Sequence, residues 1–205
     1  MIWRSALATL AIVFAVTSCG DDPDCVNGEC RCLAGEECSM SCDAPPCQVI
    51  CEEGSSCHGE CANGNCTCEA GADCDFDCAA PPCHVACKGD NPTCDGACAN
   101  GTCTCGVGSD CGFTCDTPPC HINCEGDNPS CSGSCANGTC TCGPNSVCHF
   151  ACESGPCHVD CQGQCLVDCP GQTAGTQDCD ITQCAAGDIV VCSNGLSTTC
   201  GAECP

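Results

Sequence analysis

Residues 98–134, CANGTCTCGVGSDCGFTCDTPPCHINCEGDNPSCSGS, decide the fold of this chain. The stretch holds eight cysteines, and related stretches begin at Cys25, Cys61 and Cys135, so the unit recurs every 36 or 37 residues. Self-similarity at such a period is typical of solenoids and other repeat architectures. We therefore predict four repeats over 25–169, with boundaries at 25–60, 61–97, 98–134 and 135–169.

Within each unit the recurring piece is Cys-x-x-x-Cys with an apolar middle residue, as in residues 74–78, CDFDC. An alternation of period two predicts a strand, with Cys74, Phe76 and Cys78 on one face and Asp75 and Asp77 on the other. Turn-forming pairs separate the pieces, among them Pro118-Pro119, Asn128-Pro129 and Asn137-Gly138. No segment after residue 18 has helical periodicity, so we expect little or no helix in the mature chain.

The reach of an extended chain limits how these cysteines can pair. Two cysteines four residues apart in a strand, such as Cys111 and Cys115, have Cα atoms roughly 13 Å apart, whereas a disulfide needs roughly 4.4 to 6.8 Å. Cys111 and Cys115 must therefore bond cysteines on other strands. Cys103 and Cys105 should not bond each other either. We predict a small disulfide-rich β-solenoid-like rod of short strands and turns, about nine residues per rung. Its disulfides would join neighbouring rungs, with one connectivity in units two and three.

A string of small disulfide knots is the alternative architecture. The run Asn100-Gly-Thr-Cys103-Thr-Cys105 resembles the second half of an EGF-like module. That family has six cysteines and usually an aromatic residue after Cys-x-Cys, whereas each unit here has eight cysteines and lacks that aromatic residue. Disulfides confined within each unit would favour this alternative.

Composition requires cross-links of some kind. Cysteines number 39 of 205 residues, and aromatic residues make up 2%. Few large apolar side chains remain for a core, so disulfides or bound metal must offset the conformational entropy. We expect disulfides at the following cysteines of the four units: Cys25, Cys30, Cys32, Cys38, Cys61, Cys66, Cys68, Cys74, Cys98, Cys103, Cys105, Cys111, Cys135, Cys140, Cys142 and Cys148.

Residues 1–18 read as an export signal. The apolar stretch Ser5–Val16 follows a start with one positive charge, and it is shorter than the roughly 20 residues that span a bilayer. Its end, Val16-Thr17-Ser18-Cys19, resembles the lipobox of bacterial lipoproteins. The resemblance implies a diacylated Cys19 at the new N-terminus, followed by a polar tether over 19–24. Ordinary secretory cleavage after Ser18 is the alternative, although lipidation of Cys19 leaves 38 cysteines, an even number.

The resemblance also implies a location. A lipid on Cys19 would make the bilayer a partner and anchor the chain in the cell envelope without spanning it. Gly20 follows the cysteine, and by resemblance to enterobacterial lipoproteins this permits outer-membrane sorting. The mature chain would then face the periplasm or the cell surface.

The charge is strongly acidic, with a net value of −24 from 27 acidic and three basic residues. Such a chain repels nucleic acid and favours solubility, cations and basic partners. We interpret most of the acidic residues as a solvated surface. Asp73, Asp75 and Asp77 are weak candidates for binding Ca²⁺, which takes several oxygen ligands.

The histidines suggest a surface column. Each of three histidines follows a cysteine at the equivalent position of its repeat: His84, His121 and His158. This repetition favours an exposed row over a metal site or a catalytic site. The chain has no Cys-x-x-Cys, no Gly-x-Ser-x-Gly, no phosphate loop and no His-Glu-x-x-His. We therefore expect no enzyme activity and no cofactor.

Metal-thiolate binding is the main rival to a scaffold. Cys-x-Cys recurs in every unit, as in metallothioneins, but exported cysteines are normally oxidised.

The tail, 170–205, reads as a linker followed by a small disulfide-bonded cap. We expect a membrane-anchored structural or adhesion-type lipoprotein with a protein or surface partner that the sequence does not identify, and as the alternative an extracytoplasmic metal-buffering protein.

Overall fold

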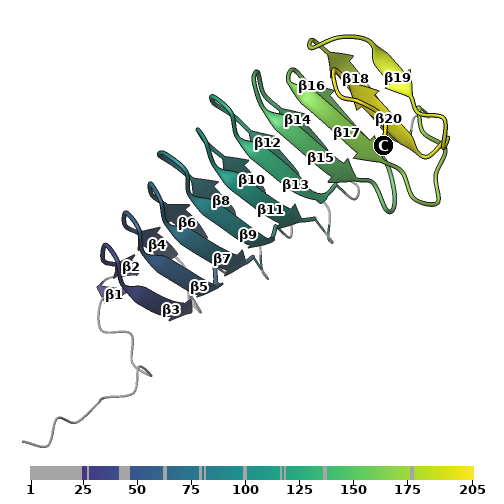
Figure 1. Ribbon diagram of the computed structural model, residues 1–205. Coiled ribbons are helices and arrows are strands. Elements are labelled where there is room, and N and C mark those ends of the chain that lie inside the picture. Colours follow the sequence, from purple (N-terminus) through teal and green to yellow (C-terminus); the bar gives the residue numbers. More distant parts are fainter. Residues whose placement is uncertain are drawn as a thin grey trace, which may run out of the picture.

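The computed structural model describes residues 25–26, 28–41, 47–61, 64–78, 80, 82–98, 101–115, 117, 119–135, 138–175 and 178–205, and over these residues it has strands and turns without a helix. The chain winds into two ten-stranded sheets that run side by side along a rod (Figure 1). The predicted β-solenoid is confirmed, with about eight turns.

Sheet A contains β1 and the even-numbered strands up to β18. They are β1 (Cys25–Val26), β2 (Glu29–Cys32), β4 (Cys47–Cys51), β6 (Gly64–Cys68), β8 (His84–Cys87), β10 (Thr102–Cys105), β12 (His121–Cys124), β14 (Thr139–Cys142), β16 (Cys157–Cys161) and β18 (Cys179–Cys184).

Sheet B contains the remaining strands. They are β3 (Glu37–Ser41), β5 (Ser56–Glu60), β7 (Asp73–Asp77), β9 (Thr93–Ala97), β11 (Asp110–Thr114), β13 (Ser130–Ser134), β15 (Val147–Ala151), β17 (Gln164–Asp168), β19 (Ile189–Val191) and β20 (Ser197–Cys200).

One coil of the solenoid is twice as long as the sequence suggested. Cys66, Val85 and Cys103 occupy the same position in successive parallel strands β6, β8 and β10, so a coil takes 19 or 18 residues. The prediction of nine residues per rung was wrong because consecutive strand-and-turn pieces lie in opposite sheets. Only every second piece stacks, and each repeat unit therefore forms two coils.

The inward faces follow the predicted alternation. On β7, Cys74 and Phe76 are buried while Asp75 and Asp77 are exposed. Along sheet B a phenylalanine coil alternates with a glycine coil, since Gly96 lies opposite Phe113 and Gly133 lies between Phe113 and Phe150. A Cβ on Gly133 would overlap the carbonyl oxygen of Phe113, so glycine is required where the neighbouring coil crowds the backbone. This alternation is the reason that the repeat spans two coils.

Between β2 and β18 the described disulfides close the turns between consecutive strands of the winding chain and do not join stacked strands of neighbouring coils. Cys105 bonds Cys111 and Cys115 bonds Cys120, so Cys111 and Cys115, four residues apart, pair with different strands as predicted. Cys103 bonds Cys98 and not Cys105, also as predicted. The prediction that disulfides join neighbouring strands is confirmed. The joined strands are consecutive in the chain and lie in opposite sheets, because a turn of a few residues already brings sequence-near cysteines to Cα distances of 5.7–6.4 Å in units two and three.

The same connectivity recurs in units two and three, as predicted. The bonds of these units stay within each unit, which was expected to favour separate knots. The sheets nevertheless continue across the unit boundary, because β9 pairs with β11 in parallel. The units are held together by backbone hydrogen bonds, so local disulfides do not exclude a continuous rod.

The C-terminal tail is part of the same body. Strand β18 extends sheet A, and β20 pairs antiparallel with β17 and with β19. The segment expected to be a linker packs against the solenoid, since Ala174 is buried and the Gln172 amide donates a hydrogen bond to the Gly155 carbonyl. Cys192 bonds Cys204, so the expected disulfide-bonded cap exists but closes the end of the rod directly.

Candidate functional site

Two rows of disulfides line the interior of the rod. The first, which we call the A-to-B column, closes the turns that lead from sheet A to sheet B. It comprises Cys32–Cys38, Cys51–Cys57, Cys68–Cys74, Cys87–Cys94, Cys105–Cys111, Cys124–Cys131, Cys142–Cys148 and Cys161–Cys165.

The second row, the B-to-A column, closes the turns that lead back. It comprises Cys61–Cys66, Cys78–Cys83, Cys98–Cys103, Cys115–Cys120, Cys135–Cys140, Cys152–Cys157 and Cys169–Cys179. Cys30 and Cys47 are also disulfide-bonded. The side chain of Cys25 lies outside the described residues.

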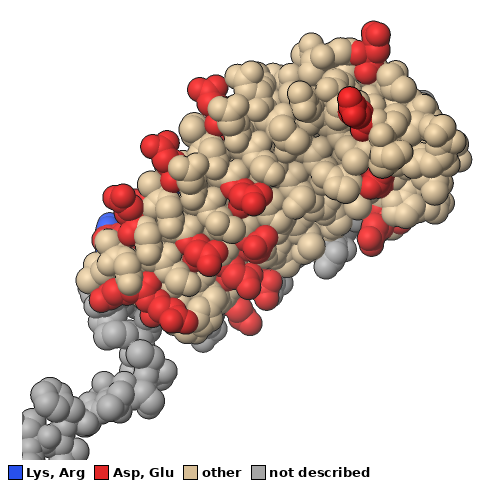
Figure 2. Space-filling model, in the orientation of Figure 1, with Lys and Arg blue, Asp and Glu red and all other residues tan. Residues whose placement is uncertain are grey.

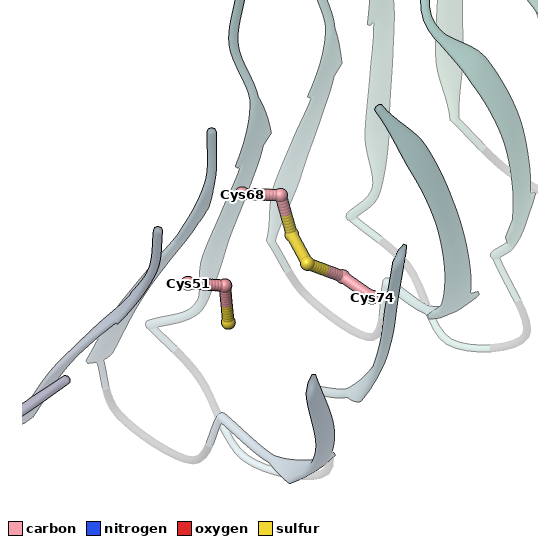
Figure 3. Close-up of side chains that lie close together, drawn as sticks. All are labelled: Cys51, Cys68 and Cys74. Atoms are coloured by element: carbon pink, nitrogen blue, oxygen red, sulfur yellow. A yellow bond between two sulfur atoms is a disulfide. The ribbon is translucent and has the colours of Figure 1, made fainter. Parts of the chain in front are cut away.

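Sulfurs of neighbouring coils approach one another in the A-to-B column. Figure 3 shows the sulfur of Cys51 beside the disulfide of the next coil, and the sulfurs of Cys51, Cys68 and Cys74 all lie within 4.8 Å of one another. Three further groups share this geometry: Cys87, Cys94 and Cys111; Cys124, Cys131 and Cys148; and Cys142, Cys148 and Cys165. If reduced, such groups are soft sulfur sites of the kind that bind zinc or Cu(I).

The predicted aspartate candidates face outward on one strand. Asp73, Asp75 and Asp77 are exposed on β7. Among the residues that the structure describes, no group of three donor atoms within 4.8 Å of one another includes them. The structure therefore places them on a solvated face without bringing their carboxylates together as a chelate.

Carboxylates from neighbouring coils nevertheless crowd Asp95. Asp95 lies opposite Asp75 in the ladder. Two residues before it on β9 is Thr93, which has Asp73 opposite it on one neighbouring strand and Asp110 on the other. Burial raises the pKa of Asp95, and the negative charges of Asp75, Asp110 and Asp73 raise it further. This part of sheet B is an acidic face, which we define by Glu60, Asp73, Asp75, Asp77, Asp95 and Asp110. Figure 2 shows acidic side chains gathered on the N-terminal half of the rod.

The three repeat-equivalent histidines form an exposed row on sheet A. His84 and His121 both face Thr102, one on each side, and His121 and His158 both face Thr139. Each of them is exposed. In the described part of the chain none belongs to a converging group of metal-binding side chains. The placement matches the expected surface column.

Sheet A also carries a stretch without carboxylates. From β6 to β14 its outward residues are Asn65, Thr67, His84, Ala86, Thr102, Thr104, His121, Asn123, Thr139 and Thr141. We call this the neutral face. The rod thus presents an acidic face and a neutral face of hydroxyl, amide and imidazole groups, both repeating at the coil spacing of about 4.8 Å.

A polar cluster near the C-terminal end was missed by the sequence analysis. The Ser197 hydroxyl donates to one oxygen of Asp168 at 2.6 Å, and Nε2 of His149 lies 2.7 Å from the other. Burial by itself would raise the pKa of Asp168, but these two hydrogen bonds and the imidazole charge outweigh burial, so the pKa is lowered. The contact joins β15, β17 and β20, which lie far apart in sequence, and no local pattern signals it.

A shallow groove of about 490 Å³ lies near the last coils. Its lining residues are uncharged and mostly polar: Asn128, Asn145, Ser146, Val147, Gln162, Gly163, Gln164 and Ala186. Nearby, the turn closed by Cys161 and Cys165 spans four positions, whereas the equivalent turn closed by Cys124 and Cys131 spans seven. The groove adds hydrogen-bonding groups but no titratable side chain.

No family model, curated protein or solved structure matches the chain. The described residues contain no helix that is long and apolar enough to cross a membrane. The expected signal segment, Cys19 and its tether lie outside the described residues. The class that the fold and its cysteines define is therefore a disulfide-rich β-solenoid.

Proposed function

We propose that this chain is a membrane-anchored extracytoplasmic lipoprotein whose solenoid is a structural or interaction scaffold without catalytic activity. The observation that carries the proposal is the disulfide at each described turn from sheet A to sheet B between β2 and β17. A scaffold cross-linked this densely suits an oxidising compartment outside the cytoplasm. The lipobox-like end of the first eighteen residues supports the anchor.

The repeated faces are the surfaces through which such a scaffold would act. The neutral face offers the same kinds of hydrogen-bonding group at each coil, while the acidic face disfavours nucleic acid and anionic lipid headgroups. An adhesion-type partner, either a protein or an extended surface, is the kind that a repeating array can bind at several points at once.

The anchor has a direct test. Intact-mass analysis of the mature protein is expected to show a diacylglyceryl addition on a chain that begins at Cys19. Cys19→Ser should release the protein from the membrane fraction, whereas Thr17→Ser, which keeps a small residue before the cysteine, should leave it there. An unmodified, soluble wild-type product would overturn the proposed anchor.

Extracytoplasmic metal buffering is the second candidate. The four cysteine groups favour it, because each places three sulfurs within 4.8 Å. Their sulfurs are held in disulfides, so this function requires reduction. A thiol count on protein taken from its native compartment separates the two candidates: few thiols support the scaffold, and many thiols with stoichiometric zinc or copper support the buffer.

A further inference from the structure

Three contiguous coils of the A-to-B column hold sulfurs in a chain of short separations. Cys165 is bonded to Cys161, yet its sulfur lies within 4.8 Å of both sulfurs of the Cys142–Cys148 disulfide. Cys148 in turn lies within 4.8 Å of both Cys124 and Cys131. Cys148 is therefore shared by two groups and connects the coil of β16 and β17 with that of β12 and β13.

The backbone accommodates bonds between these coils. Cys148 lies directly opposite Cys165 in sheet B, and Cys142 lies opposite Cys161 in sheet A. Adjacent strands are about 4.8 Å apart, which falls within the Cα separation that a disulfide tolerates. The ladder bond Cys148–Cys165 is thus within reach without a change of fold. The bond Cys142–Cys165 would cross diagonally from sheet A to sheet B, between two sulfurs that already lie within 4.8 Å of each other.

We propose that this part of the A-to-B column is a site of intramolecular thiol–disulfide exchange, through which a thiol formed at Cys165 migrates inward to the next two coils. The exchange partner from outside is a small dithiol reductant. The proposal depends on sulfur geometry alone, so it holds whether or not the chain is lipid-anchored.

The chemistry conserves atoms and electrons. A dithiol reduces Cys161–Cys165 to two thiols and becomes a disulfide itself. The Cys165 thiolate then attacks the Cys142 sulfur, so the Cys142–Cys165 bond forms, the Cys142–Cys148 bond breaks, and Cys148 leaves as a thiolate. Cys148 attacks Cys124 or Cys131 in the same way and frees the other. Only the first step changes the oxidation state, because each later step exchanges one disulfide for another.

The cap gives the reductant its entrance. Cys184–Cys200 closes the end of the column, with Cys184 opposite Cys161 and Cys200 opposite Cys165. Cys184 is partly exposed, whereas Cys161 and Cys165 are fully buried. The dithiol should therefore open Cys184–Cys200 first and reach Cys161–Cys165 afterwards. Exchange would then replace the opened turn of Cys161–Cys165 with a covalent link between coils.

The test uses the full-length oxidised protein with a thiol placed by mutation. Cys161→Ser leaves Cys165 without its partner, and no reductant is then needed. The matched control, Cys115→Ser, leaves a buried thiol at Cys120, which belongs to the B-to-A column and faces Gly138, not a cysteine, in the next coil. After incubation at neutral pH, samples are quenched in acid, unfolded in denaturant and labelled with a maleimide at mildly acidic pH. They are then digested without reduction and mapped by mass spectrometry.

The expected result for Cys161→Ser is a shift of the label from Cys165 to Cys142, Cys148, Cys124 or Cys131, with a matching link from Cys165 to Cys142 or Cys148. The control should keep its label on Cys120. Label confined to Cys165, with all other pairs unchanged, would overturn the proposal. If Cys161→Ser fails to fold, limited reduction of the wild-type protein decides: links from Cys165 to Cys142 or Cys148 support the exchange, and their absence refutes it.

Discussion

Single residues determine the backbone conformation of the turns. Asn91, Asn128 and Asn145 have positive φ values in turns, and asparagine tolerates this conformation better than most residues. The turns at residues 90–91 and 127–128 accept equivalent hydrogen bonds, since Gly71 donates to the Asp90 carbonyl and Gly108 to that of Asp127. The turn at Asn128-Pro129 could be predicted, because it depends on neighbours in sequence. These hydrogen bonds could not, because they join neighbouring coils.

The Asp168 contact gives a pH-dependent prediction. Because its folded pKa is lowered, ionised Asp168 stabilises the fold above the unfolded-state pKa, and the contribution is lost as the pH falls through the folded value. Asp168→Asn should lower the free energy of unfolding by about 1 kcal/mol at pH 7 and by progressively less below about pH 4. Denaturant unfolding across pH measures this, with the exposed Asp188→Asn as control. An equal deficit at pH 7 and pH 2 would contradict it.

At the scale of strands, the sequence predicted which faces are buried and that cysteines four apart do not bond each other, but it did not identify the strand that supplies each partner. Period two places Cys74 and Phe76 inside, and this holds. The reach argument excludes a bond between Cys111 and Cys115, but it cannot choose between Cys105 across the turn and Cys94 across the ladder. Cys105 and Cys94 are both close to Cys111 in space, and only the winding of the chain into two sheets determines which of them is the partner. The same ambiguity led to a coil half its real length.

The glycines that alternate with phenylalanine along the inward side of sheet B give a prediction for the strands. A Cβ on Gly133 would overlap the backbone of Phe113, which the ladder holds in place, so Gly133→Ala should destabilise the protein by about 2–4 kcal/mol. Gly54→Ala is the control: it adds the same atom where no other atom lies within 4 Å, at a strained φ of 70°. Thermal or denaturant midpoints compare the two. A Gly133 variant as stable as the Gly54 variant would show that the coils are not packed this closely.

At the scale of the whole molecule, the disulfides replace a conventional core. Large apolar side chains in the described interior amount to about one for every two strands, such as Phe76 or Val85, and most other interior positions are cysteine. We expect full reduction to unfold the chain outright, not merely to lower its stability. Small-angle scattering and protease digestion at ambient temperature measure this. A reduced chain that stays compact and resistant would show that the ladders and apolar residues suffice.

The most direct test of the central claim is a disulfide map of the oxidised protein, with thiols blocked before digestion and without reduction. Bonds along the turns are expected, among them Cys68–Cys74, Cys105–Cys111 and Cys115–Cys120. Almost no free thiol should be found. A resting map dominated by bonds along the ladder, such as Cys94–Cys111, or by unpaired cysteines would contradict it.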